Sequence, residues 1–77
     1  MLLTITDVEY LGDYTLLCTF STGECRKVDL TPLLSYPAFE ELRDKNEFVQ
    51  FGLEDTIFWK NGADIAPERI YEMGLAA

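Results

Sequence analysis

Three carboxylates, Asp29, Asp64 and Glu68, are the side chains of this sequence that could bind a hard cation or act as a catalytic acid–base pair. A calcium loop needs oxygen ligands at closely alternating positions, and these residues do not have that spacing. An acidic domain also supplies pairs of carboxylates by chance, and nothing beside them marks a nucleophile. We therefore expect no metal ion, no cofactor and no catalytic residue, and we expect that the protein is not an enzyme.

Cysteine chemistry is the other candidate. The chain has no His, which removes the commonest general base, the commonest metal ligand and the usual partner of a nucleophilic thiol. Two cysteines alone do not make a zinc site. In the strand register derived below, Cys18 faces the core and Cys25 faces the opposite side, so the two cannot form a disulfide. Cys18 is predicted to be a small buried hydrophobe.

The charge of the chain limits its partners. Fourteen acidic residues against six basic ones give a net charge of −8, which opposes the counterion release that drives nucleic-acid binding. The acids are scattered, which is typical of a solvated surface. The apolar runs are far shorter than the roughly 18 residues that cross a bilayer, and the N-terminus lacks the pattern of a signal peptide. We expect a cytoplasmic protein that binds neither nucleic acid nor membrane directly.

The elements that would position these residues begin with strands. Residues 3–10 have the alternation of a strand whose phase shifts near Thr6–Asp7, which indicates a bulge. A turn at Gly12–Asp13 leads into a clearer strand over 14–20, in which every second residue is apolar.

The next loop can be placed by comparing two lengths. A two-residue loop would force β-branched Thr22 to a positive φ, whereas a three-residue loop over 21–23 leaves only Gly23 in the left-handed region. The longer loop is favoured because it also turns Val28 and Leu30 toward the core. The predicted pairs are Phe20 with Glu24, Cys18 with Arg26, Leu16 with Val28 and Tyr14 with Leu30.

Helical signals follow. Thr31–Pro32 is predicted to be a cap and the first position of a short turn, and Pro37 to open a helix that continues through Lys45. Its acids come early and its bases late, as the helix dipole prefers. Asn46 is a candidate left-handed terminator.

The C-terminal half is predicted to contain two strands and a helix. Val49, Phe51 and Leu53 alternate as a strand, Glu54–Asp55 forms a turn, and Ile57 and Trp59 alternate as the next strand. Asn61–Gly62 then fits a two-residue hairpin loop. A last helix runs from Pro67 to Met73 and ends at Gly74.

The order strand-strand-strand-helix-strand-strand-helix predicts one α+β domain over residues 1–77. Its helices are expected to pack on one face of a small antiparallel sheet. Trp59 is expected to lie between the sheet and the closing helix.

The chain resembles a known family in four segments, which read DYTLLCTFSTGE, VDLTPLL, AFEELRDKNEFVQ and TIFWKNGADIAPERIYEMG. These are similar to the domain of unknown function 2442 family of small bacterial proteins. The most specific part is Trp-x-Asn-Gly-x-Asp-Ile-x-Pro-x-x-Ile-Tyr, residues 59–71. The resemblance implies a fold and no reaction. It departs at Ala66, where the family usually has an acid, and the lost N-cap is expected to cost the last helix about 1 kcal/mol.

The same segment supplies the candidate motif, which consists of Trp59, Asn61, Gly62, Asp64 and Pro67. The structural interpretation is a corner in which Asp64 accepts hydrogen bonds from the turn or from the last helix. The functional interpretation is a binding surface formed by the same residues.

Three classes of function remain open. The first is a small acidic non-enzymatic protein-interaction domain, antitoxin-like or accessory to the product of a neighbouring gene, with a homodimer as its simplest assembly. The second is a stand-alone regulatory or ligand-sensing domain, because longer members of the resembled family carry a helix-turn-helix. The third is a small enzyme, against which the absence of His argues.

Overall fold

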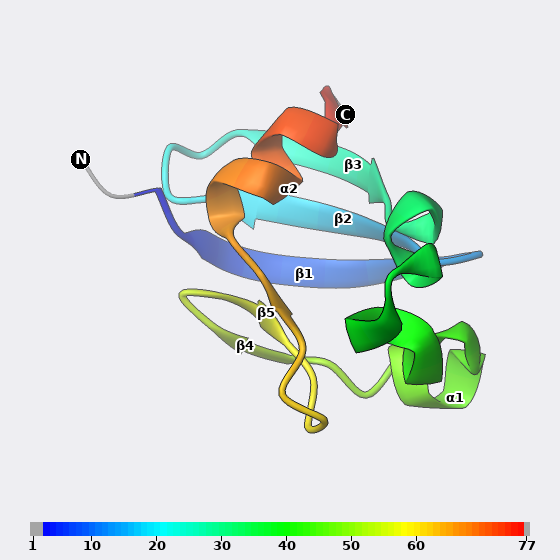
Figure 1. Ribbon diagram of the computed structural model, residues 1–77. Helices are drawn as coiled ribbons and strands as arrows, with labels where there is room; N and C mark the ends of the chain where they lie inside the picture. The colour runs from blue at the N-terminus through cyan, green and yellow to red at the C-terminus, as the bar shows by residue number, and fades with distance from the viewer. Residues whose placement is uncertain (1–2, 77) are drawn as a thin grey trace.

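The computed structural model describes residues 3–76, and these residues form two antiparallel sheets (Figure 1). The larger sheet has the strand order β1-β2-β3-β7 and consists of β1 (Ile5–Gly12), β2 (Thr15–Phe20), β3 (Cys25–Asp29) and β7 (Leu75–Ala76). The smaller sheet has the order β4-β5-β6 and consists of β4 (Gly52–Glu54), β5 (Thr56–Phe58) and β6 (Asp64–Ile65).

Short helical segments connect the sheets. Between β3 and β4 the chain forms two 3₁₀ helices and one α-helix, η1 (Thr31–Ser35), η2 (Pro37–Arg43) and α1 (Lys45–Phe48). The α-helix α2 (Pro67–Met73) joins β6 to β7. The combination of antiparallel strands and helices confirms the predicted α+β class.

The expectation of a single sheet in the order β-β-β-α-β-β-α is wrong. The two sheets are separate. The tip of the β4–β5 hairpin lies beside β1, where Asp55 O accepts a backbone hydrogen bond from Ile5 N at 2.8 Å. The bulge in β1 lies directly after Ile5, and bulges bend and twist a strand. We attribute the split between the sheets to this bend, which prevents β1 and β4 from continuing a common ladder.

The first hairpin contains the predicted bulge, but its turn lies one residue later than expected. Ile5 pairs with Phe20 and Asp7 pairs with Thr19, so Thr6 is the extra residue of the bulge. The loop is Asp13–Tyr14, both at positive φ, as a two-residue hairpin loop of type I′ requires. Tertiary contacts override the poor propensity of Tyr at this φ: its ring meets Phe48 edge-on at 5.1 Å and its hydroxyl donates to the Arg43 carbonyl.

The second hairpin has the predicted length and register. Phe20 N donates to Glu24 O and Gly23 N donates to Phe20 O, both at 2.8 Å, which closes a three-residue loop. Gly23 has a φ of 89°, while Thr22 stays out of the left-handed region. The pairs Leu16–Val28 and Cys18–Arg26 are confirmed, and Leu30 N bonds to Tyr14 O as expected.

The expected helix over 37–45 is wrong beyond Arg43. Asp44 is extended and caps a new helix, its Oδ1 accepting from Asn46 N at 2.9 Å, so Asn46 lies inside α1 and terminates nothing. Asp is a strong N-cap residue, and the break lets Leu42 and Phe48 both enter the core. Leu30, not Thr31, is likewise the N-cap of η1, with Asp29 accepting from Thr31 N.

The expected strand over 49–53 is shorter than predicted because α1 occupies the residues directly before it. Val49 is the C-cap of α1 and has helical backbone angles, so pairing starts only at Gly52. The following strand and the final helix are confirmed, with α2 spanning Pro67–Met73 and Gly74 as its C-cap.

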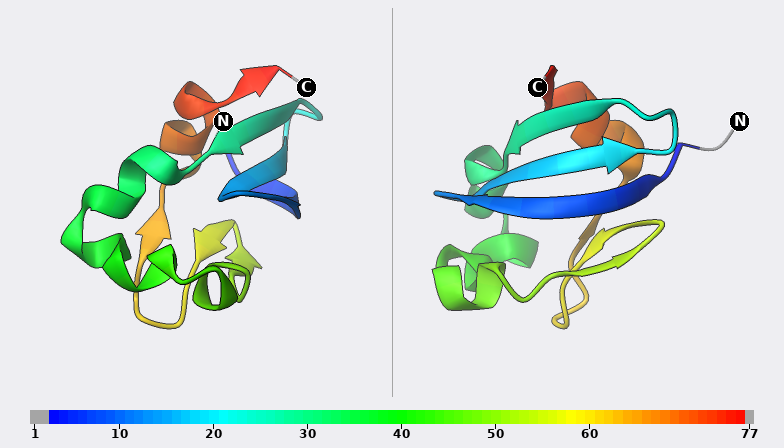
Figure 2. Two further views of the ribbon diagram at one scale, coloured as in Figure 1. Left: turned by 90° about the vertical axis from the view of Figure 1, so that its right-hand side faces the viewer. Right: turned by 180° about the vertical axis from the view of Figure 1, so that it is seen from behind.

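The core lies between the two sheets and the helical segments, and the strands curve around this core (Figure 2). Its largest fully buried side chains come from every part of the chain: Phe20, Phe48, Leu16, Leu30, Ile57, Ile70, Val28 and Cys18. Seen from behind, β1, β2 and β3 lie in the foreground with no helix in front of them.

Candidate functional site

Trp59 of the candidate motif is a core residue. It follows β5 directly, is 3% exposed, and its indole Nε1 donates to the Phe48 carbonyl at 2.9 Å. Its ring lies 5.7 Å from the Phe48 ring and 6.2 Å, edge-on, from the Phe39 ring. Trp59 therefore packs on η2 and α1, and it offers almost no surface to a ligand.

The loop after Trp59 is a structural turn with three residues rather than the expected two. Trp59 N donates to Ala63 O at 2.8 Å and Gly62 N donates to Trp59 O at 3.0 Å. Gly62 has a φ of 93°, while Asn61 stays out of the left-handed region and its Oδ1 accepts from Ala63 N at 3.0 Å. The geometry repeats that of the loop before β3, since in both a Gly ends a three-residue loop.

Asp64 does not have the role that the sequence suggested. It is exposed in β6, and within residues 3–76 its carboxylate accepts no hydrogen bond from the turn or from α2. The amide of Asn61 already serves the turn, and Ala66 gives α2 no side-chain cap. Pro67 opens α2 as expected. The five motif residues are thus divided between core and surface and do not converge.

The Asp29 carboxylate stabilises the start of η1. Asp29 Oδ1 accepts from Thr31 N at 2.9 Å, and hydrogen bonds from Thr31 lower the pKa of the Asp29 carboxyl. In the part of the chain that the structure describes, no three His, Cys, Asp or Glu residues are grouped as metal ligands would be.

The two cysteines lie on opposite faces of the larger sheet, as predicted. Cys18 is fully buried, and burial raises the pKa of its thiol to about 12, so it stays protonated and inert. Cys25 is half-buried on the other face, with its Sγ 3.4 Å from Thr19 Oγ1. Both are free thiols.

A small hollow opens beside Trp59. Its volume is ≈ 10 Å³, and its lining comprises Glu41, Leu42, Glu47, Gln50, Trp59, Lys60 and Asn61. A water molecule needs about that much space, whereas ligand pockets enclose roughly 300–1,000 Å³. The hollow is too small for a substrate.

A polar cluster that the sequence analysis missed joins β3 to α2. Arg26 Nε donates to Glu24 Oε2 at 2.6 Å, and its guanidinium lies over the Tyr71 ring at 3.7 Å. Arg26 Nη1 also donates to the carbonyls of Tyr71 and Gly74, at 3.0 and 3.3 Å. Tyr71 Oη closes the cluster by donating to Glu24 Oε1 at 3.0 Å. The sequence did contain one indication of this cluster: Glu24 and Arg26 are two residues apart, which puts them on the same face of a strand and lets them form an ion pair.

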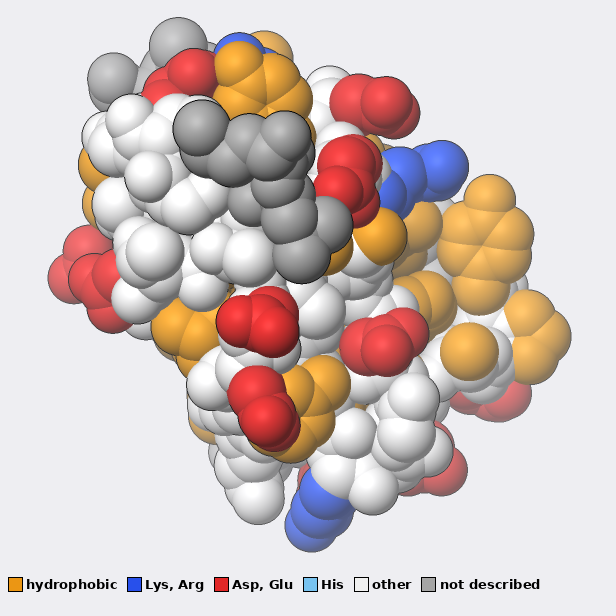
Figure 3. Space-filling model, turned by 90° about the vertical axis from the view of Figure 1, so that its left-hand side faces the viewer, with side chains coloured by type: hydrophobic (Ala, Val, Ile, Leu, Met, Phe, Trp, Pro, Cys, Tyr) orange, Lys and Arg blue, Asp and Glu red, His pale blue; other side chains and the backbone are white. Residues whose placement is uncertain are grey.

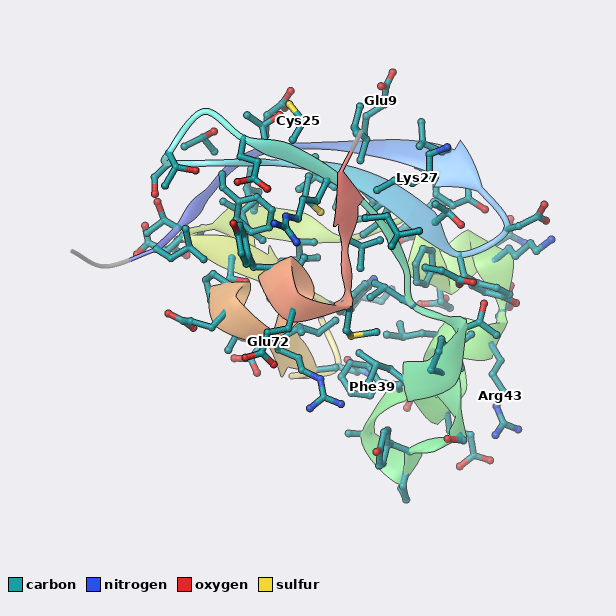
Figure 4. The ribbon with its side chains drawn as sticks, turned by 90° about the horizontal axis from the view of Figure 1, so that it is seen from above. Glu9, Cys25, Lys27, Phe39, Arg43 and Glu72 are labelled. Carbon is teal, nitrogen blue, oxygen red and sulfur yellow. The ribbon has the colours of Figure 1, made fainter. Side chains whose placement is uncertain are left out.

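The surface least used by the fold is the outer face of the larger sheet, which points away from α2. Figure 4 shows Glu9, Cys25 and Lys27 projecting on this side and α2 on the other. Strand alternation defines the outer face by Asp7 and Glu9 from β1, Thr15, Leu17 and Thr19 from β2, Cys25, Lys27 and Asp29 from β3, and Leu75 from β7. Leu11 is the extra residue of a second bulge in β1, and it follows Tyr10, which packs against the core. Leu11 is 44% exposed and Leu75 is 73% exposed.

Acidic side chains are dispersed over the surface rather than gathered. Figure 3 shows one such side, where carboxylates lie singly among polar and hydrophobic groups.

No helix within residues 3–76 has the length and hydropathy to cross a membrane.

Fold and surface together define a small acidic α+β domain with a tightly packed aromatic core and an uncovered sheet face. The chain belongs to the family described as Protein of unknown function (DUF2442), whose profile matches residues 5–74. No curated protein and no solved structure matches it.

Proposed function

We propose that this chain is a non-enzymatic protein-interaction domain, which acts as an accessory or antitoxin-like partner of another protein. The outer face of the larger sheet is the observation that carries this proposal. Its neighbours in the fold leave Leu75 in water, although aliphatic side chains gain free energy when a partner covers them.

The charge of the chain supports the same interpretation. A net charge of −8 disfavours nucleic acid as the partner and leaves protein as the macromolecule that suits a mixed apolar and charged sheet face. Two of the residues singled out for chemistry are meanwhile used by the fold, Cys18 in the core and Asp29 at the start of η1.

The test is quantitative affinity capture from the native cell. The bait is compared with Leu17→Glu, which places a charge on the outer face, and with Leu53→Glu, a matched control on the smaller sheet. Thermal unfolding of each bait verifies that it is folded.

We expect the unmodified chain and Leu53→Glu to retain the same protein in stoichiometric amount, and Leu17→Glu to lose it. Equal retention by all three baits would place the contact elsewhere, and no retained protein together with a monomeric chain would contradict the proposal.

A further inference from the structure

One row of the outer face carries opposite charges on either side of an aliphatic side chain. Glu9 of β1 pairs across the ladder with Leu17 of β2, and Leu17 pairs with Lys27 of β3. The three side chains therefore stand in a line with Leu17 between the two charges, and Leu75 of β7, which pairs with Lys27, continues the row. Glu9 and Lys27 are exposed, and within residues 3–76 neither has an ion-pair partner.

The row is complementary to itself. Strands in a sheet are about 4.8 Å apart, and two sheets pack face to face about 10 Å apart. If two copies are related by a two-fold axis that runs along β2 between the faces, the axis exchanges β1 with β3. Glu9 of each copy then lies opposite Lys27 of the other, and Leu17 meets Leu17.

The alternative two-fold axis, at right angles to the strands, is excluded by charge. It would place Glu9 over Glu9 and Lys27 over Lys27, and like charges set directly opposite each other are destabilising. The charge pattern thus selects one of the two arrangements.

The neighbouring rows are compatible with the selected arrangement. Asp7, Thr19 and Cys25 form one row, so the axis sets the Asp7 side chain over Cys25 and not over another carboxylate. Asp29 pairs with Thr15, and the axis places Asp29 over the Gly12 end of β1. No two carboxylates of these rows lie directly opposite each other.

We propose that the partner of the outer face is a second copy of this chain, in a two-fold dimer that is fixed by reciprocal Glu9–Lys27 pairs around Leu17. This inference rests on the proposed function. The three strands that the axis brings face to face, β1, β2 and β3, give a face of roughly 14 by 17 Å, which is smaller than a standard specific interface. The dimer is accordingly weak and depends on concentration.

Sedimentation velocity of the full chain from about 10 μM to about 1 mM tests the proposal. We expect the sedimentation coefficient to rise with concentration for the unmodified chain. Glu9→Lys and Lys27→Glu should each stay monomeric, because both reciprocal pairs become repulsive. An equimolar mixture of the two variants should associate again, because every pair in the mixed dimer is attractive.

Net charge serves as the internal control. Glu9→Lys changes the charge from −8 to −8 + 2 = −6, so a dimer limited only by overall repulsion would become tighter, whereas the proposal predicts that it is lost. Glu72→Lys makes the same change on α2, on the other side of the sheet, and should leave the dimer intact. Circular dichroism verifies that all variants are folded.

Three results would overturn the dimer: a monomeric unmodified chain at every concentration, self-association of Glu9→Lys as strong as that of the unmodified chain, or a mixture that stays monomeric. A monomeric chain that still captures a different protein through Leu17 overturns this inference and leaves the proposed function standing. A chain that neither self-associates nor retains a partner overturns both.

Discussion

At the scale of single residues, Gly23 ends the loop between β2 and β3 with a φ of 89°, and a Cβ built there meets open space. A side chain at this position would cost backbone strain and no steric clash. Gly23→Val should therefore lower the free energy of unfolding by at least about 1 kcal/mol. Urea unfolding measures the loss, and Gly23→Asn, which tolerates the left-handed region better, should lose less.

Trp59 presents the opposite case, in which packing rather than backbone angle decides. Trp59→Ala removes a buried ring and leaves the Phe48 carbonyl without its donor, which should cost about 3 to 5 kcal/mol. A loss of that size would unfold much of so small a domain. The native protein should show blue-shifted fluorescence that acrylamide quenches poorly, and a red-shifted, readily quenched spectrum would contradict the burial of Trp59.

At the scale of elements, α2 depends on a residue from another part of the chain. The helix has no side-chain N-cap and no basic residue in its last turn, so Arg26 of β3 supplies the positive charge and the donors at its C-terminal end. Ile70 of the helix is fully buried, and the Tyr71 ring meets the Phe20 ring of β2 edge-on at 5.2 Å, which holds the helix against the sheet.

Arg26→Lys should loosen α2 although it keeps the charge. An ammonium group cannot reproduce the planar fork that reaches Glu24 and the two carbonyls while stacking on Tyr71. Hydrogen exchange of the α2 amides should become faster, and Arg69→Lys, an exposed change on the helix itself, should leave it unchanged. Equal exchange in both variants would show that the cluster does not hold the helix.

The same cluster predicts the response of the protein to acid. Hydrogen bonds from Arg26 and Tyr71 lower the pKa of the Glu24 carboxyl, and the bond from Arg26 has the larger effect. A lowered folded-state pKa means that this stabilisation is present above the pKa of the unfolded chain, about 4.3, and is lost as the pH falls through the folded value. Glu24→Gln should therefore reduce stability at pH 7 and flatten the decline below about pH 4.3, as measured by urea unfolding across pH. An unchanged acid slope would contradict the prediction.

At the scale of the whole molecule, the net charge predicts that nucleic acid is a disfavoured partner. A domain of net charge −8 should bind no duplex DNA at about 150 mM salt, because it has few cations with which to displace counterions. Fluorescence anisotropy of a labelled duplex checks this, and a rise that disappears steeply with added salt would show that DNA binds after all.

Features that depend on neighbours along the chain could be predicted from the sequence. The bulge at Thr6, the loop ending at Gly23, the opposite faces of Cys18 and Cys25, and the limits of α2 follow from φ preferences, strand alternation and proline geometry. These are local constraints, and a single sequence contains them.

Features that depend on contacts between distant residues became visible in the folded structure. It moved the first turn to Asp13–Tyr14 because Tyr14 packs on Phe48, and it broke the helix at Asp44 so that Leu42 and Phe48 could both be buried. It also stacked Arg26 on Tyr71, 45 residues away. Burial and cross-strand stacking outweigh local propensity at such positions, because the free energy gained there depends on a partner that no local pattern identifies.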